Sequence, residues 1–314
     1  MKTWTEADIP DQSGRTALVT GANSGLGLQT SVALAAKGAR VLIACRNPER
    51  GQQALSTVAA AASTPPELVP LDLADLASVH AAVARVGELT GGALHILINN
   101  AGVMAVPKAH TRDGFELQFG TNHLGHAALT WLLMPALRRG TDARVVTLSS
   151  LAASGGRVDF DDPNFDHRRY NPATAYAQSK IANQIFALEL DRRLRAAGED
   201  VISVAAHPGY TATNLTANMS KAQGNVVVRA VMDRVTALGD LLIAQSVRTG
   251  ALPSLIAATA PDVNGGDYIA PRQFRGMRGN PAVVPPLRAA LDRENGSRLW
   301  SLTAKLTSVI PDPA

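Results

Sequence analysis

A tyrosine and a lysine four residues apart, Tyr176 and Lys180, are the residues whose types and spacing point most directly to chemistry. In a helix this spacing places both side chains on one face, so an ammonium group can lie beside a phenol. A neighbouring positive charge favours the phenolate and lowers the phenol pKa from its ordinary value of about 10. The pair therefore predicts a group that exchanges a proton with a carbonyl oxygen, although the same spacing also occurs in ordinary surface pairs.

A glycine-rich turn lies far upstream of this pair. The strand-like run TALVT at 16–20 leads into GANSGLG, and a helical pattern follows. Glycine lets the backbone turn tightly and approach a pyrophosphate, which then rests on the N–H groups at the helix N-terminus. The cofactor contacts that we predict in this turn are Gly21, Asn23, Ser24, Gly25, Leu26 and Gly27.

The order of motifs along the chain resembles that of the short-chain dehydrogenase/reductase family. The shared motifs are the GxxxGxG turn, NNAG at 99–102, Ser150 and the Tyr176/Lys180 pair, and the resemblance covers about residues 14–309. TNHLGH at 121–126, HPG at 207–209 and the late DYIAP are similar to the retinol-dehydrogenase-like branch of that family.

The resemblance implies a division of roles in catalysis. Ser150, rather than its neighbour Ser149, would donate a hydrogen bond to the substrate oxygen and stabilise the charge that develops there. Tyr176 would give or take the substrate proton. Lys180 would lower the pKa of that tyrosine and hold the nicotinamide ribose. Asn122 would position a water molecule between the lysine and solvent, although an asparagine in a helix often bonds to local backbone instead.

The end of the second predicted strand bears on which cofactor is bound. An NAD enzyme places an acidic residue there to bond the ribose 2′-hydroxyl, whereas this chain has Cys45 followed by Arg46. A guanidinium group can bind a 2′-phosphate through charge-assisted hydrogen bonds, so we expect NADP(H) to be favoured over NAD(H). The resemblance adds as cofactor contacts Asp72, Leu73, Asn99, Ala101, Gly102, Pro208, Gly209 and Thr211, besides Tyr176 and Lys180.

The elements that must position these residues follow an alternating pattern. Apolar runs of strand length alternate with longer helical patterns from Thr16 onward, which predicts βαβ units and a parallel sheet. We expect an α/β fold: a single doubly wound Rossmann domain over 1–314 with about seven parallel strands and helices on both faces. Helices are expected at 48–62, at 113–139 and around Tyr176, and strands at 16–20, 40–45, 67–71, 94–98, 144–149, 201–206 and 267–270.

Three further segments lie outside this repeating pattern. Ser150 and Tyr176 are 26 residues apart, about twice the usual distance in the family, so we expect 157–171 to be an inserted loop near the substrate mouth. Residues 212–249 are expected to form a helical lid. Within the lid, 225–244 is interpreted as an amphipathic helix that covers substrate, a partner subunit or a membrane surface. Residues 281–314 are expected to form a C-terminal tail.

Composition excludes several other classes of function. The 314 residues carry a net charge of +4, but Lys and Arg are scattered, so no nucleic-acid partner is expected. His123 and His126 lie three apart without a third ligand at a supporting spacing, so no metal site is expected. The sequence contains no run of 18 apolar residues, so no transmembrane segment is expected. The single cysteine, Cys45, is compatible with a reducing compartment, and we expect a cytoplasmic protein.

These expectations describe an NADP(H)-dependent oxidoreductase that acts on an apolar ketone, aldehyde or alcohol, with Tyr176 as the acid/base. One alternative is a reductase of an activated C=C bond. Another is a non-catalytic NADP(H)-binding sensor or partner protein, which would need only the glycine turn. A homo-oligomer is possible, because family members often pair through the helices that carry Asn122 and Tyr176, and a tail can block that surface.

Overall fold

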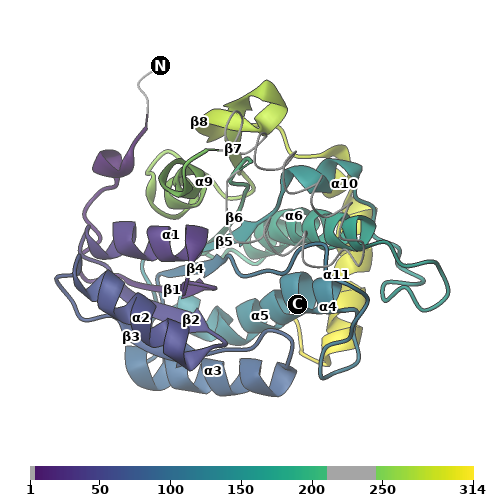
Figure 1. Cartoon of the computed structure of the whole chain (residues 1–314), viewed down its shortest axis with the longest axis horizontal. Helices are drawn as coiled ribbons and strands as arrows, with labels where there is room; N and C mark the ends of the chain where they lie inside the picture. Colours follow the sequence, from purple (N-terminus) through teal and green to yellow (C-terminus); the bar gives the residue numbers. More distant parts are fainter. Residues whose placement is uncertain (1–3, 211–244) are drawn as a thin grey trace, which may run out of the picture.

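The computed structural model describes residues 4–210 and 245–314. Among these residues eight strands form one sheet in the order β3-β2-β1-β4-β5-β6-β7-β8 (Figure 1). The first seven strands are parallel, and β8 runs antiparallel to β7. The strands are β1 (Thr16–Thr20), β2 (Arg40–Cys45), β3 (Glu67–Pro70), β4 (Ile96–Asn99), β5 (Arg144–Leu148), β6 (Ile202–Ala206), β7 (Tyr268–Gln273) and β8 (Arg278–Val283).

Helices cover both faces of the sheet, as the alternating pattern predicted. The α-helices of the described residues are α1 (Gly25–Ala35), α2 (Pro48–Ala59), α3 (Leu76–Thr90), α4 (Leu117–Phe119), α5 (Gly125–Leu137), α6 (Pro172–Ala196), α9 (Val247–Thr259), α10 (Arg288–Leu291) and α11 (Arg293–Thr307). Side chains of β1 alternate between two cores: Ala17 and Val19 pack with α1, α2 and α9, and Leu18 packs with α3, α5 and α6. The fold is therefore the expected doubly wound α/β arrangement.

Shorter helical turns complete the framework. A π-helical turn, η2 (Gly120–Leu124), joins α4 to α5, so the predicted helix at 113–139 begins at Leu117 and is widened in its first turns. The 3₁₀ turns are η1 (Glu6–Asp8), η3 (Leu151–Gly155) and η4 (Phe274–Gly276). π-turns inside α-helices often occur at functional sites, and η2 contains Asn122.

The eighth strand was not predicted from the sequence. Gly279 and Pro281 interrupt β8, and both residue types weaken a strand signal; the edge position of β8 explains why a proline is tolerated. The remainder of 281–314 contains α10 and α11. Trp300 of α11 stacks on Phe186 of α6 at 5.6 Å between ring centroids and meets Trp131 of α5 edge-on at 4.8 Å. The C-terminal segment therefore covers part of the α5 and α6 surface.

The predicted lid lies almost wholly outside the described residues, which omit 211–244 and with them Thr211 and the expected helix at 225–244. The last residues of the predicted lid, 247–249, are the first turn of α9, which packs against α1. The two ends of the omitted stretch meet: Gln245 donates its backbone N–H to the Tyr210 carbonyl at 2.9 Å, and Tyr210 donates to the Met277 carbonyl at 2.7 Å.

Candidate active site

A cavity of about 560 Å³ lies at the carboxyl ends of the parallel strands, where the strand order reverses between β1 and β4. In open α/β sheets this switch point is the usual place for a ligand. Most of the predicted cofactor contacts line the cavity, namely Gly21, Asn23, Ser24, Gly25, Leu26, Gly27, Arg46, Asp72, Leu73, Ala101, Gly102, Tyr176, Lys180 and Pro208. Asn99, Asn122, Ser150 and Gly209 are not among the lining residues.

The glycine turn forms a cradle that only glycine permits. Gly21 and Gly25 have φ angles of 66° and 54°, which L-residues with a side chain rarely adopt. A Cβ built on Gly27 would lie 2.5 Å from the Gly21 carbonyl oxygen, so a larger residue there would push the turn apart.

The N-terminus of α1 differs from those of the neighbouring helices. Ser24 at the N-cap of α1 makes no side-chain capping bond, whereas Asn47 caps α2 and Asp75 caps α3. The first turn of α1 therefore has no side-chain cap, and its residues Gly25, Leu26 and Gly27 line the cavity, an arrangement that suits an anionic group such as a pyrophosphate. These features fit a dinucleotide.

Two guanidinium groups line the cavity beside the end of β2. Arg46 follows β2, and Arg50 lies in the first turn of α2; both are exposed and line the cavity. Arg50 was missed in the sequence, although the Asn47-Pro48 helix start, whose Asn47 Oδ1 accepts the Arg50 N–H at 2.8 Å, could have signalled it. Cys45 is buried, and burial raises the pKa of its thiol, so it stays neutral.

Tyr176, Ser150 and Lys180 come together where α6 meets the end of β5. A hydrogen bond from Ser150 lowers the pKa of Tyr176, but burial of the phenol is the larger cause and raises that pKa above its ordinary value. The expected lowering is therefore wrong in direction for this structure. Burial also lowers the pKa of Lys180 to about 8, and its Nζ donates to the Leu148 carbonyl at 3.2 Å and lies 5.8 Å from the Tyr176 ring centroid.

The two serines at the end of β5 are used differently. Ser149 Oγ donates to the Lys180 carbonyl at 2.9 Å and so belongs to the helix contact of α6. Ser150 is the N-cap of η3 and is the serine that bonds to Tyr176. This contact supports the choice of Ser150 over Ser149 as the residue that would face the substrate oxygen.

Asn122 makes long-range rather than local bonds. Its Oδ1 accepts from the Val103 N–H at 2.8 Å, and its Nδ2 donates to the Val103 carbonyl and to Ser179 Oγ, each at 2.9 Å. Gly102 lies between Asn122 and the lysine: a Cβ there would come within 3.0 Å of Asn122 Oδ1 and 3.6 Å of Lys180 Nζ. Both polar atoms of the Asn122 side chain are thus engaged by the protein itself.

His123 and His126 are buried and bonded within the protein. His123 Nε2 lies 2.9 Å from Thr303 Oγ1 of α11, and His126 bonds to the Asn122 carbonyl and to Thr20. Within residues 4–210 and 245–314, no three His, Cys, Asp or Glu side chains come together as metal ligands.

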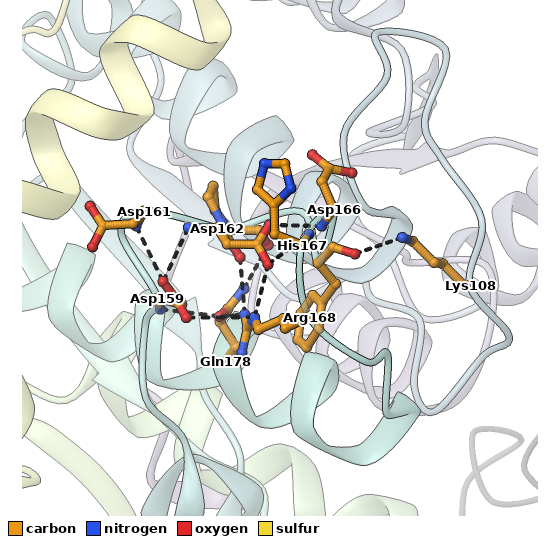
Figure 2. Close-up of polar contacts among 10 residues, drawn as sticks. Lys108, Asp159, Asp161, Asp162, Asp166, His167, Arg168 and Gln178 are labelled. Carbon is orange, nitrogen blue, oxygen red and sulfur yellow. Dashed lines mark hydrogen bonds and ion pairs between the residues drawn. The ribbon is translucent and has the colours of Figure 1, made fainter.

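The segment 157–171, which we expected to be an inserted loop, is fastened to α6 by polar contacts (Figure 2). Gln178 of α6 accepts from the Asp159 N–H at 3.2 Å and from the Arg168 guanidinium at 2.8 Å, and it donates to the Pro163 carbonyl at 2.8 Å. On the other side, Lys108 Nζ donates to the Phe165 carbonyl at 2.6 Å. The loop is therefore tied two residues away from Tyr176.

Known proteins share this fold and sequence. The family model for short chain dehydrogenase matches residues 15–224. Polyprenol dehydrogenase from Mus musculus is 40% identical over 304 residues, which cover 95% of this chain and 85% of the relative. Retinol dehydrogenase 13 from Homo sapiens is 37% identical over 310 residues, covering 97% and 87%. A crystal structure of an uncharacterized protein from Mycobacterium paratuberculosis has 41% identity and a TM-score of 0.80, with 98% of each chain covered.

The chain belongs to the short-chain dehydrogenase family, whose members are oxidoreductases that bind a nicotinamide cofactor. Within this family it is retinol-dehydrogenase-like, as the TNHLGH and HPG motifs indicated. None of the helices in the described part of the chain has both the length and the apolar character needed to cross a membrane.

Proposed function

We propose that this chain is an NADP(H)-dependent oxidoreductase that transfers a hydride between nicotinamide and an apolar ketone, aldehyde or alcohol, with Tyr176 as the acid/base. The observation that carries the proposal is that Tyr176 and Lys180 line the same cavity as the glycine cradle, with Ser150 bonded to Tyr176. When bound there, the cofactor supplies the hydride donor or acceptor. The protein supplies the proton and the fixed positions of the reacting groups.

Tyr176 enters the reaction protonated. Because burial raises its pKa, the phenol keeps its proton at neutral pH and can donate it to a carbonyl oxygen as negative charge develops there. The Ser150 hydroxyl has one hydrogen, so it would turn from Tyr176 to donate a second hydrogen bond to the same substrate oxygen. The pKa of Lys180, about 8, lies near neutral pH. Lys180 can therefore hold the nicotinamide ribose and pass a proton toward the phenol.

The preference for NADP(H) is supported by the charges at the end of β2. Arg46 and Arg50 line the cavity there, and Cys45 occupies the position of the acidic residue that an NAD enzyme uses. A 2′-phosphate beside two guanidinium groups would gain charge-assisted hydrogen bonds.

The apolar substrate class is supported by the names of the relatives. Polyprenol and retinol, the alcohols in those names, are both largely hydrocarbon. We include a cytoplasmic location in the proposal because the one cysteine of the chain, Cys45, is a free and buried thiol.

A substrate screen tests the proposal. Purified protein is incubated with NADPH or NADH and a panel of apolar aldehydes and ketones that includes conjugated enals, and the products are identified. We expect NADPH-dependent formation of alcohols. Saturation of the C=C bond would favour a C=C reductase, and cofactor binding without turnover of any panel member would favour a sensor. The same screen includes the variant Tyr176→Phe. Its matched control is Tyr268→Phe, because Tyr268 is a buried phenol of β7 outside the cavity lining.

A further inference from the structure

Three buried polar residues form a stripe along one face of the helix that begins at η2. Asn122, His126 and Thr130 are spaced four residues apart, so they lie on one face, and their exposures are 0%, 1% and 0%. Their neighbours on α5 are mostly alanine, leucine, tryptophan and methionine. Buried polar side chains need partners. Thr130 bonds to Asn99, His126 reaches Asn100 and Ala101 through Thr20, and Asn122 bonds to Val103, so the stripe spans the segment 99–103.

The two ends of the stripe bond to the two ends of that segment. Thr130 Oγ1 accepts from Asn99 Nδ2 at 2.9 Å and donates to the His126 carbonyl at 2.7 Å. Asn122 pairs with the N–H and the carbonyl of Val103. The helix therefore fixes the position of both ends of the turn after β4.

His126 holds the middle of the segment through Thr20. His126 Nε2 lies 2.8 Å from Thr20 Oγ1, and the same oxygen accepts the backbone N–H groups of Asn100 and Ala101, each at 2.9 Å. Thr20 is the last residue of β1 and immediately precedes the glycine turn. One histidine thus joins η2, the end of β1 and the turn after β4.

The hydrogen-bond network assigns the tautomer of this ring. His126 Nδ1 lies 2.9 Å from the Asn122 carbonyl, which can only accept, so Nδ1 carries the hydrogen. Burial lowers the pKa of His126 to about 3, so the ring is neutral and Nε2 accepts the Thr20 hydroxyl hydrogen. The alternative acceptor, the Ile98 carbonyl, is farther away at 3.3 Å. The lone pairs of Thr20 Oγ1 are then turned toward the two N–H groups.

We propose that His126 is a positioning residue for the cofactor: through Thr20 and Asn122 it sets the relative position of the glycine turn and the 100–102 turn. This inference rests on the proposed cofactor site. The two turns touch, because a Cβ built on Gly21 would lie 2.9 Å from the Ala101 Cα. Asn100, Ala101 and Gly102 all line the cavity, so a shift of this contact changes the shape that the cofactor meets.

Two amide substitutions separate the two bonds of the ring. A glutamine amide reaches the place of Nε2 and can keep the contact with Thr20, whereas an asparagine amide reaches the place of Nδ1 and can keep the contact with the Asn122 carbonyl. His126→Leu removes both bonds. Because Thr20 is the link to the cavity, we expect cofactor affinity to fall in the order wild type, His126→Gln, His126→Asn, His126→Leu. For His126→Leu we expect a loss of about 10-fold to 100-fold.

His123 provides the matched control. It lies in the same π-helical turn and is equally buried, but its Nε2 meets Thr303 of α11 rather than the cofactor segment. We expect His123→Leu to lower the thermal midpoint by an amount similar to that of His126→Leu while leaving the NADPH dissociation constant within about twofold of wild type. Thr20→Val, which removes only the hydroxyl, should weaken NADPH binding as His126→Leu does and should be insensitive to the further change His126→Gln.

The experiment titrates each folded variant with NADPH and with NADH by fluorescence and measures kcat and KM for the cofactor. The inference predicts that KM for NADPH rises by the stated factor, that kcat at saturation stays within about threefold, and that glutamine restores binding. Equal dissociation constants for His126→Leu and His123→Leu, or no recovery with glutamine, would overturn it. If wild-type protein binds neither cofactor, both the proposed function and this inference are wrong. If His126→Leu does not fold, the Thr20→Val and His126→Gln comparison decides alone.

Discussion

The two sides of the candidate active site are held by different kinds of contact. On the side of the glycine turn, the segment 99–103 is bonded directly to Asn122 and Thr130 and, through Thr20, to His126; these three helix residues are at most 1% exposed. On the side of the inserted loop, Arg168 and Asp159 have side chains that are 30% and 37% exposed, and the bonds of the loop are mostly to charged groups and loop carbonyls (Figure 2). The first side is bonded wholly within the core, whereas the loop combines partly exposed ion pairs with bonds to the buried Gln178.

This difference suggests how function is divided between the two sides. Contacts inside a core resist displacement, because breaking one leaves a buried polar group without a partner. Partly exposed ion pairs can be exchanged for water at little cost. We therefore expect changes on the side of the glycine turn to alter NADPH binding and chemistry, and changes in the loop to alter the substrate KM alone.

The largest effect is expected at Tyr176, the proposed proton donor. Tyr176→Phe should lower kcat by about 10² to 10⁴, because a positioned acid is lost, while NADPH binding changes little. Steady-state kinetics and NADPH titration measure both quantities. Tyr268→Phe, the buried-phenol control, should keep kcat within about threefold of wild type. Retention of more than half the wild-type kcat by Tyr176→Phe would remove the tyrosine from its proposed role.

The next effect concerns the charges at the end of β2. Arg46→Ala and Arg50→Ala should each weaken NADPH binding by about 10-fold to 100-fold, the range for a lost charge-assisted hydrogen bond, and leave NADH binding nearly unchanged. Arg85→Ala, an exposed arginine of α3 paired with Glu88, is the control. If the ratio of NADPH to NADH affinity moves less than threefold in both variants, neither guanidinium contacts the 2′-phosphate.

The inserted loop should show a smaller effect confined to substrate. Gln178→Leu removes a fully buried amide and leaves the Arg168 guanidinium and the Asp159 N–H without this partner. We expect the substrate KM to rise by about 5-fold to 10-fold, equivalent to roughly 1 to 1.4 kcal/mol, with the NADPH dissociation constant unchanged. A matching loss of NADPH affinity would show that the two sides are not independent.

The smallest effect is a dependence of stability on pH. Burial lowers the pKa of His123 and of His126 to about 3 and that of His207 to about 4. The unfolded chain binds protons as pH falls through its ordinary histidine pKa of about 6.5, whereas the folded protein does not. The free energy of unfolding should therefore fall by about 1 kcal/mol per buried histidine between pH 7 and pH 5.5.

Urea denaturation at the two pH values measures this loss. In His123→Leu, the loss of unfolding free energy between pH 7 and pH 5.5 should be smaller by about 1 kcal/mol, the contribution of one buried histidine. The same variant should also be less stable than wild type at pH 7. An unfolding free energy that is independent of pH over this range would mean that these rings take up protons in the folded protein just as they do in the unfolded chain.

The parts of the fold and site that follow local rules could be predicted from the sequence. The seven parallel strands are short apolar runs, and all seven occur in the structure. Their first residues differ from the predicted ones by at most two positions, and their last residues by at most three. The glycine turn could be predicted as well, because its backbone conformation depends on the glycines themselves. The edge strand β8 was missed, since Gly279 and Pro281 hide its pattern.

Other features depend on contacts between distant residues. The raised pKa of Tyr176 follows from burial by the folded chain, and no spacing of Tyr and Lys in the sequence reports that burial. The π-helical turn and the pairing of Asn122 with Val103 also arise only when α5 meets the segment after β4. The contacts of Gln178 with the inserted loop are of the same kind.

The central claim is hydride transfer between NADPH and a carbonyl carbon, with Tyr176 supplying the proton. Its most direct test is a single turnover of an apolar enal with NADPH that carries deuterium at both C4 positions, followed by mass spectrometry and NMR of the product. The account predicts one deuterium on the carbinol carbon of an allylic alcohol, and none when Tyr176→Phe replaces the wild-type protein over the same interval. Deuterium on the carbon β to an intact carbonyl, or no labelled product with the wild-type protein, would contradict it.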